Sequence, residues 1–413
     1  MKIKTAIKSF LARAALNLAG LNTNPGREGL FLSQTKSGAH ITVENSFNVP
    51  AVYACLRVLT NTLSVMPMGL RRKLDGGRKN EDATEHPVNK IFANEPNPEQ
   101  VPSVWKRTQM LHICTWGNAY NYIQRDRGGR IKQLWMLMPN RMNVVRNSNG
   151  VLEYHYTFAD GGIYVFKKED ILHIPGLSFD GVVGKSIIGA HREAIGLAVS
   201  AQEYGARFFS SGGNLKGVLS VEGELQPEQI TRIRESWNAA YNEENSNKTA
   251  VLECGTKYEA ISIPPNDAQF IETRAMQDEQ IASIFGVPLP LIQKTEKTTS
   301  WGSGIEQLMI AFIQLTMLPY IVTFEETIKQ KMLTEEEKNN LYIKFKTAGL
   351  LRGDFKSRIE GYRNGKYVGM YSTNEIRELE DMNPIPGGDD DYWLPANMTI
   401  LGKNNTTGDN NEN

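Results

Sequence analysis

Residues Gly181 to Ser186 read GVVGKS and are the strongest candidate for nucleotide chemistry in the sequence. In a phosphate-binding loop of the GxxxxGKS type, glycines let successive main-chain amides surround the phosphates. Phe179 stands where the first of these glycines is needed, and Pro175 interrupts the apolar run that would form the preceding strand. We therefore interpret 181–186 as a turn that leads into the next helix.

Metal-binding motifs are incomplete in the same way. His191 and Glu193 form an H-x-E pair, but no P-C-x-x-C follows, so a deaminase-type zinc site lacks its other ligands. Asp389, Asp390 and Asp391 lie beside two glycines without the alternation of a calcium loop, which favours a solvated acidic turn.

The GxSxG motif of a serine nucleophile and the HExxH motif of a zinc protease are also missing. His112 and Cys114 lie near Trp116 in an apolar helical pattern, where packing in the core is the expected role. We predict no catalytic residue, no metal site and no cofactor. Missing motifs do not exclude an enzyme, because catalytic side chains can be distant in the sequence and close in the fold. The alternative that stays open here is a phosphate-handling α+β enzyme that uses the 181–186 turn.

The chain has 413 residues, enough for two or three domains at roughly 150 residues each. Its 46 Lys plus Arg balance 46 Asp plus Glu, whereas a protein that holds DNA through many phosphate contacts usually has a basic excess. The three cysteines are far apart, which excludes a disulfide scaffold and fits a reducing compartment. Tight, sequence-specific DNA binding is therefore disfavoured.

Two segments have the composition to contact a membrane. Residues 1–20 have the spacing of a basic amphipathic helix, and residues 307–324 contain no charge, which reaches the lower length limit for a spanning helix. Pro319 lies inside the second segment, and acidic Glu306 and Glu325 flank it, unlike the basic flanks of a spanning helix. We favour a helix buried by protein and no membrane contact. A peripheral membrane protein is the second alternative.

The first half of the chain predicts helices around a β-rich region. Pro50 opens a helix whose apolar stripe runs from Val52 to Met66 and which Pro67 ends. From about 119 to 175, apolar and polar residues alternate between glycine-containing turns, which predicts an antiparallel meander. Residues 187–209 then predict one helix with many alanines, suited to close neighbours in the same chain or in another copy.

The second half predicts a small αβ insert, at 210–265, between two long helices. Its strands are expected at 217–221, 249–253 and 258–263, with a helix from Pro227. Asn266 begins the next helix, which Gly286 and Pro288 end. Residues 286–302 show no periodicity, and ordered loops of that length are usually functional.

The longest predicted helix follows this loop. Ser303 and Glu306 form its capping box, it runs to about Leu333, and Pro319 should bend it. A strand at 341–345 and two short helices within about 353–381 come next, and the chain ends in an Asn-rich tail that is typical of disorder.

Six ordered blocks together resemble the portal proteins, or head-tail connectors, of tailed bacteriophages, a family of many siphophages and prophages. The blocks are VPAVYACLRVL (49–59), HPVNKIFANEPNP (86–98), GNAYNYIQRD (117–126), EYGARFFSSGGNLKGVL (203–219), TRAMQDEQIASIFGVP (273–288) and MNPIPGGDDDYW (382–393). The resemblance covers about 45–395. It implies an α+β portal fold that assembles as a dodecameric ring at one vertex of the capsid.

The resemblance also assigns a part to each segment that it covers. In chain order these are the first part of the wing, with the meander and its helices (46–186), stem helix 1 (187–209), the clip (210–265), stem helix 2 (266–285), the tunnel loop (286–302), the rest of the wing, with the long kinked helix and the return strand (303–349), and a helical crown (350–395). For the two ends the resemblance implies nothing, and their residues alone predict a flexible basic arm (1–45) and a disordered tail (396–413).

Site residues follow from these parts. The tunnel loop would present to the DNA channel Lys294, Lys297, Thr298, Thr299 and Trp301. The junction between loop and long helix would depend on Ser303, Glu306 and Pro319. The clip would meet partner proteins through Glu222, Glu224, Arg232, Glu235 and Tyr241.

The implied partners are further copies of the chain, the large terminase, a head-tail adaptor, the major capsid and scaffold proteins, and double-stranded DNA that passes without sequence specificity. Zero net charge suits such passage, because many Lys or Arg contacts would hold the phosphates. The protein would lie at the portal vertex of the virion, and in the host cytoplasm during assembly. The energy for packaging would come from the terminase, so the resemblance implies that this chain has no enzymatic activity.

Overall fold

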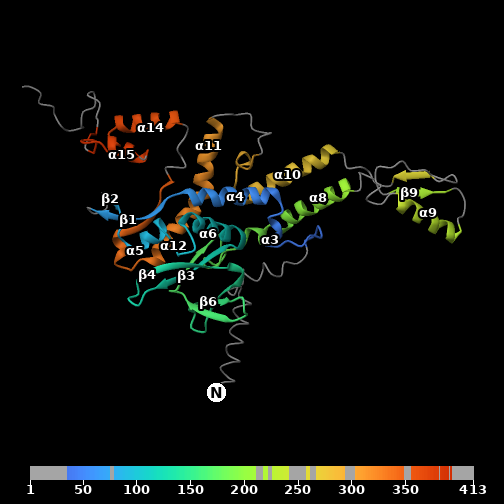
Figure 1. Ribbon diagram of the computed structural model, residues 1–413, viewed down its shortest axis with the longest axis horizontal. Helices are drawn as coiled ribbons and strands as arrows, with labels where there is room; N and C mark the ends of the chain where they lie inside the picture. The colour runs from blue at the N-terminus through green and yellow to red at the C-terminus, as the bar shows by residue number, and fades with distance from the viewer. Residues whose placement is uncertain are drawn as a thin grey trace, which may run out of the picture. The chain divides into compact units, whose positions relative to one another are not determined.

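The computed structural model describes residues 35–74, 79–210, 217–221, 226–240, 257–260, 267–293, 303–347, 355–380, 382–389 and 391–392. They belong to two compact units, which divide between Lys346 and Thr347 (Figure 1). The first unit combines helices with antiparallel sheets, and the described part of the second is helical. The predicted tail and residues 1–34 of the predicted basic arm lie outside the described residues, whereas residues 35–45 of that arm are described and bury Thr35, Ile41 and Val43.

Helix α4 (Pro50–Val65) packs against α6 (Pro102–Trp116) and α10 (Asp267–Phe285) in the first unit. Its predicted stripe is confirmed, because Val52, Leu56, Leu59 and Leu63 are buried and Met66 follows as a buried C-cap. Burying each such side chain contributes about 1.5–3 kcal/mol. The short helices α3 (Val43–Ser46) and α5 (Pro87–Ala93) lie on either side of α4 in the sequence.

The predicted single meander is wrong in its connectivity, because its strands form two three-stranded antiparallel sheets. One sheet has β3 (Asn118–Arg125) between β4 (Ile131–Leu137) and β8 (Ile171–Pro175). The other has β6 (Leu152–Thr157) between β5 (Met142–Arg146) and β7 (Ile163–Lys167). Strand β8 does not continue from β7 but pairs with β3. The burial of four successive residues of β8 suits a strand covered on both faces, whereas β7 buries only Phe166.

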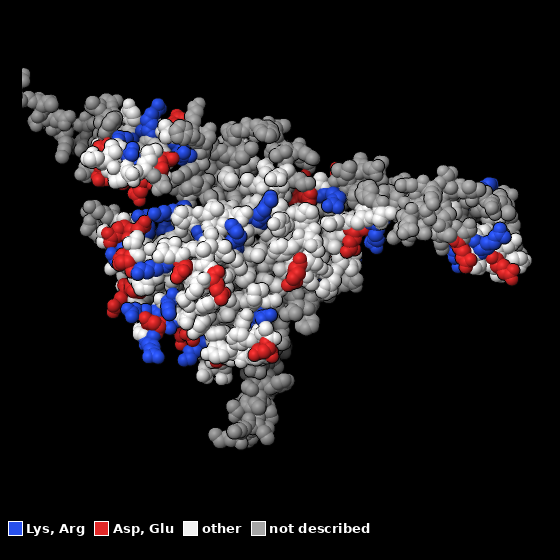
Figure 2. All heavy atoms as spheres, viewed as in Figure 1, with Lys and Arg blue, Asp and Glu red and all other residues white. Residues whose placement is uncertain are grey.

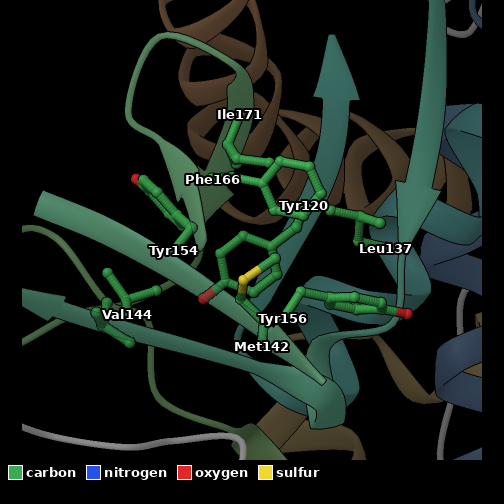
Figure 3. Packing of buried hydrophobic residues seen from close by; sticks show 9 residues of the cluster. Tyr120, Leu137, Met142, Val144, Tyr154, Tyr156, Phe166 and Ile171 are labelled. Atoms are coloured by element: carbon green, nitrogen blue, oxygen red, sulfur yellow. The ribbon is translucent and has the colours of Figure 1, made fainter. Parts of the chain in front are cut away.

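The two sheets share one apolar core. Figure 3 shows Tyr120, Leu137 and Ile171 of the first sheet beside residues of the second, which include Met142, Val144, Tyr154, Tyr156 and Phe166. The rings of Tyr120 and Tyr154 meet edge to face, with centroids 6.1 Å apart. Val183, which belongs to the turn after β8, packs into the same cluster. That turn is therefore anchored to both sheets.

A third sheet has β1 (Met68–Leu74) between β2 (Lys79–Asp82) and β11 (Leu341–Phe345), which confirms the return strand. Helix α12 (Leu318–Met332) packs on both β8 and β11 and thereby joins this sheet to the core. The rings of Phe324 and Phe345 are 6.2 Å apart in that contact. The short helix α13 (Glu337–Asn340) connects α12 to β11.

The helix predicted at 187–209 is two helices, α7 (Ile187–Ala190) and α8 (Arg192–Ser210). His191 interrupts them with φ −111° and ψ 23°, just after a first turn that the Ser186 hydroxyl caps. In the insert, β9 (Gly217–Ser220) pairs with β10 (Lys257–Ala260), and α9 (Pro227–Ala240) begins at the predicted proline. The strand expected at 249–253 and the cap residue Asn266 lie outside the described residues.

The second unit contains the two predicted short helices, α14 (Phe355–Tyr367) and α15 (Thr373–Leu379). Glu380 links them, since it accepts hydrogen bonds from Arg358 and Tyr362, each at 2.7 Å. Ser372 begins α15 with a complete capping box that includes Glu375.

Candidate functional site at the end of helix α10

Helices α8 and α10 pack against each other, and Figure 1 shows them side by side. Helix α10 ends where Gly286 adopts a φ of 65°, and the N–H of the buried Val287 donates to the carbonyl of Ala282 at 2.9 Å. The stop that Gly286 and Pro288 predict is therefore confirmed. A short 3-10 helix, η4 (Leu289–Ile292), follows, so the predicted aperiodic loop begins with an ordered turn.

The hydroxyl of Thr316 donates a 2.7 Å hydrogen bond to the carbonyl oxygen of Gly286, 30 positions away. A Cβ atom at position 286 would lie 2.9 Å from the Thr316 Oγ1. Position 286 thus needs glycine both for its positive φ and for this close approach. The bond ties together the two helices on either side of the predicted tunnel loop.

The long helix is irregular where it makes this contact. It consists of α11 (Ser303–Ala311), a π-helical segment (Phe312–Met317) and α12. A uniform helix bent at Pro319 was expected, but the wider π turn comes immediately before the proline. Proline has no N–H for the carbonyl four residues earlier, and a wider turn accommodates the missing bond. The same π segment carries Thr316, so Pro319 and the Gly286 contact belong to one structural feature.

All five predicted site residues of the tunnel loop lie outside the described residues, namely Lys294, Lys297, Thr298, Thr299 and Trp301. Helix α11 begins at Ser303, but the side chains of Ser303 and Glu306 are also outside the description. Pro319 is described and is exposed. The structure therefore places one of the predicted junction residues and adds two that sequence reasoning missed, Thr316 and Gln293.

Gln293 follows η4 with a left-handed φ of 66°, the one positive φ of a non-glycine residue among those the structure describes. Such a backbone conformation costs about 1 kcal/mol or more, so the surrounding structure must hold the chain in this turn. A glutamine gives no signal in the sequence for such a conformation. Thr316 gave none either, because threonine is ordinary in a helix and its partner is distant.

The clip residues divide between described and undescribed parts. Arg232 and Glu235 are exposed on α9, where with Glu228 they line a shallow hollow, whereas Glu222, Glu224 and Tyr241 lie outside the described residues. Figure 2 shows charges of both signs over α9. A mixed, exposed surface of this kind is available to a partner protein.

The 181–186 turn is confirmed as a turn that leads into α7. One carboxylate oxygen of Asp180 accepts the N–H groups of Val182 and Val183, both at 2.8 Å. The N–H of Gly184 donates to Asn118 Oδ1 at 2.7 Å, and that of Lys185 to the Leu177 carbonyl at 2.7 Å. The amides that a phosphate would need are already bonded within the protein.

Asn118 is the centre of a buried network that holds this turn. Its side-chain nitrogen donates to the Gly184 carbonyl at 2.8 Å, and its oxygen lies 2.9 Å from His173 Nε2. His173 Nδ1 lies 3.3 Å from the Tyr154 hydroxyl. We call Asn118, Tyr154, His173 and Gly184 the Asn118 network. Burial lowers the pKa of His173 to about 3, with a further effect of Lys331, so the ring is neutral.

The acidic turn at 389–391 was expected to be solvated, and of its described residues Asp389 is exposed and Asp391 is partly exposed. Both carboxylates also bind protein donors. Asp391 accepts hydrogen bonds from Lys366 Nζ at 2.8 Å and from the Thr373 N–H at 2.7 Å. Asp389 accepts one from the Asn374 side chain at 3.0 Å. Among the described residues no cluster of His, Cys, Asp and Glu has a metal-binding arrangement.

Three buried titratable side chains of the first unit, Cys55, Cys114 and His112, are unsuited to nucleophilic or acid–base chemistry at neutral pH. Burial raises the pKa of the Cys55 thiol to about 12, with a smaller effect of Asp278, and that of Cys114 to about 12. Burial lowers the pKa of His112 to about 4. The three side chains are core groups, as the apolar pattern predicts.

One helix in the described part of the chain, Gln307–Met332, is long and apolar enough to cross a membrane by length and composition. Only 28% of its most apolar window is buried. The prediction of a helix buried by protein therefore holds for one face, which includes Phe312, Met317, Ile321, Phe324 and Ile328.

Comparison with known proteins agrees with the fold. Residues 50–381 match the family described as phage portal protein. The chain belongs to this family. The probable portal protein of Streptomyces phage phiC31 is 34% identical over 385 residues, which cover 89% of this chain and 82% of the relative. The portal protein of Enterobacteria phage HK97 is 28% identical over 350 residues, 84% of this chain and 82% of that protein.

Solved structures agree on the fold. An HK97-family phage portal protein from Corynebacterium diphtheriae matches with a TM-score of 0.56 and 17% identity, over 75% of this chain and 96% of that one. A chain from the neck of a native gene transfer agent particle, computed with C12 symmetry, matches with a TM-score of 0.56 and 20% identity, over 83% of this chain and 93% of that one. This portal protein thus has the mixed α+β fold of its family. It is a structural component of a phage-type virion and not an enzyme.

Proposed function

We propose that this portal protein forms a closed ring at one vertex of the capsid, through which double-stranded DNA is packaged and later ejected. The observation that carries the proposal is the family match over residues 50–381. The C12 symmetry of the gene transfer agent neck supports a ring of twelve copies. The N–H groups of residues 182–185 bond within the protein, which argues against the enzyme alternative because a phosphate at this turn would need them.

The parts of the ring are assigned as the sequence suggests. The three sheets and the long helix form the wing, α8 and α10 the stem, the β9–α9–β10 insert the clip, residues 286–302 the tunnel loop, and the helices from 350 to 395 the crown. The packing of α8 on α10 supports a two-helix stem. The mixed charges on α9 support the clip as the surface that meets the terminase and then the head-tail adaptor.

Native mass spectrometry with negative-stain images tests the ring. We expect a particle of about twelve chains of 46.3 kDa with a central hole. A closed particle without a channel, or a chain that stays monomeric even at high concentration, would contradict the proposal.

The junction at the end of α10 is proposed to fix one end of the tunnel loop. Replacing Thr316 with valine removes a hydrogen bond worth about 1 kcal/mol, and the variant should still form rings but retain or package less DNA. Thr323→Val is the matched control, because Thr323 bonds only the Pro319 carbonyl within its own helix. The pair Ser303→Ala and Glu306→Ala tests the other end of the loop. A normal amount of packaged DNA in both Thr316→Val and the Ser303→Ala, Glu306→Ala double variant would refute the role of the junction but not the ring.

A further inference from the structure

The long helix has an apolar face that its own unit leaves exposed. Leu308, Leu315, Leu318 and Val322 are 36%, 77%, 41% and 38% exposed, and we call them the outer stripe. Leu315, Leu318 and Val322 follow one another at intervals of three and four residues, which are typical of one helix face, and Leu308 lies on α11, before the π segment. The opposite face of α12 packs on β8 and β11. Helix α12 is therefore apolar on two sides, of which the first unit covers one.

The charge pattern distinguishes this face from an ordinary solvated surface. No charged residue occurs from 307 to 324, and charges return only at Glu325, Glu326 and Lys329. A helix that faces water normally carries charged residues on its outer side. An exposed apolar patch without charge usually marks an interaction surface.

The outer stripe is also held in a fixed orientation. Leu315, its most exposed member, is adjacent to Thr316, whose hydroxyl is bonded to the end of α10. The stripe therefore lies directly beside the contact that joins the long helix to α10. Such preorganisation lowers the entropy that an interface loses when it forms.

We propose that the outer stripe packs against the neighbouring copy of this chain in the ring, an inference that rests on the proposed function. In a closed ring of identical subunits each interface joins two different surfaces of the chain, so every copy must present one surface to the next. The uncharged stripe suits the dry centre of such an interface. A lipid surface fits less well, because Glu325 and Glu326 flank the stripe where a membrane helix favours Lys or Arg.

A photo-crosslinking amino acid, p-benzoylphenylalanine, in place of Leu315 in the full chain identifies what covers the stripe. We expect products of two and more chains on denaturing gels after irradiation of assembled rings. Three outcomes would overturn the inference. They are a monomeric product linked internally to residues 355–392, a product with lipid from added phosphatidylcholine vesicles and no chain-to-chain product, or no product from rings of normal mass.

A charge substitution provides the second test. Because Leu315 is 77% exposed, Leu315→Lys should leave the fold of the subunit unchanged, as judged by circular dichroism, and reduce the ring fraction by at least about tenfold. Gln330→Lys is the matched control, since Gln330 is exposed on the same helix among charged residues, and its rings should be normal. Rings of normal yield from Leu315→Lys would refute the inference. If the unsubstituted chain forms no ring, the proposed function itself fails, and the two failures are thereby separated.

Discussion

The Asn118 network and the second unit both depend on polar side chains, but in opposite ways. Asn118 and His173 are 2% and 6% exposed and uncharged, and they lie within an apolar core. In the second unit, by contrast, Arg358 pairs with Glu380 at 2.7 Å and Lys366 with Asp391 at 2.8 Å, on side chains that are partly exposed.

The cores of the two regions differ accordingly. Among the described residues of the second unit, the fully buried polar side chains are Ser372 and Asn374, and no large apolar side chain is buried. The stability of the first region should therefore depend on geometry, because water cannot reach a buried polar group whose hydrogen-bond partner is lost. Charge state should control the second, because exposed ion pairs are weak and depend on pH and salt.

The largest effect is expected from Gly117→Ala, which attacks the geometry of the first region. Gly117 has a φ of 80°, and a Cβ there would lie 2.5 Å from the main-chain carbon of Lys185. We expect a loss of more than about 4 kcal/mol in the free energy of unfolding, or no folded protein. Gly129→Ala is the control, since Gly129 also has a φ of 80° but no atom within 4 Å, and should cost only about 1–2 kcal/mol. Denaturant unfolding measures both, and equal losses would show that the contact with Lys185 is unimportant.

Asn118→Ala should have the next largest effect. It leaves the N–H and carbonyl of Gly184 and one nitrogen of His173 without partners, at about 2–4 kcal/mol in total. Asn147→Ala provides the comparison, because Asn147 also accepts two main-chain N–H groups but in an exposed turn, where water replaces it at about 1 kcal/mol or less. Urea unfolding followed by circular dichroism distinguishes them. A loss for Asn118→Ala no greater than that for Asn147→Ala would mean that burial adds nothing.

These two regions also separate what the sequence predicts from what it does not. Local patterns fixed the α4 stripe, the end of α10 at Gly286 and the two helices of the second unit, since each depends on residues within a few turns. The role of Asn118 was not predictable, because its partners His173 and Gly184 are 55 and 66 positions away. The pairing of β8 with β3 was not predicted for the same reason. Alternation predicts a strand but not its neighbour.

The candidate site shows the same limit. Gly286 and Pro288 carry a recognised stop signal and were predicted, whereas Thr316 gains its importance only when the long helix brings it to Gly286. Pro319 predicted an irregular helix, but the form of the irregularity, a π segment, depends on how the helix packs on β8 and β11.

Acid should destabilise the first region before the second. Burial holds the pKa of His112 at about 4 and that of His173 at about 3, below the ordinary value of about 6.5. Their contribution to stability is complete above about pH 6.5 and is lost as the pH falls toward 4 and then 3, at up to about 1.4 kcal/mol per pH unit for each histidine.

The carboxylate of Asp391 behaves differently. Its hydrogen bond with Lys366, and then its bonds with Thr373, lower its pKa, so its contribution is present above about pH 3.9 and is lost only below that value. Hydrogen exchange, corrected for the intrinsic pH dependence, should therefore show that β3 and β8 lose protection between pH 6.5 and 4 while α14 and α15 retain theirs. If α14 loses protection at a higher pH than β3 and β8, acid destabilises the second unit first and the expectation is wrong.

The smallest effect is expected from Asp391→Asn, which keeps the side-chain shape but removes the charge beside Lys366. The variant should slightly increase hydrogen exchange in α14 and α15 at pH 7 and low salt, because the Thr373 bond can persist without the charge. The difference from the unsubstituted chain should narrow below about pH 4, where Asp391 of the unfolded chain becomes protonated, and in high salt, which screens the ion pair. Asp389→Asn is the control, since Asp389 bonds the uncharged Asn374 side chain, and its effect should not vary with salt. If Asp391→Asn lowers the hydrogen-exchange protection of α14 and α15 by an amount that does not depend on pH or salt, the second unit is held by geometry rather than by charge, like the first region.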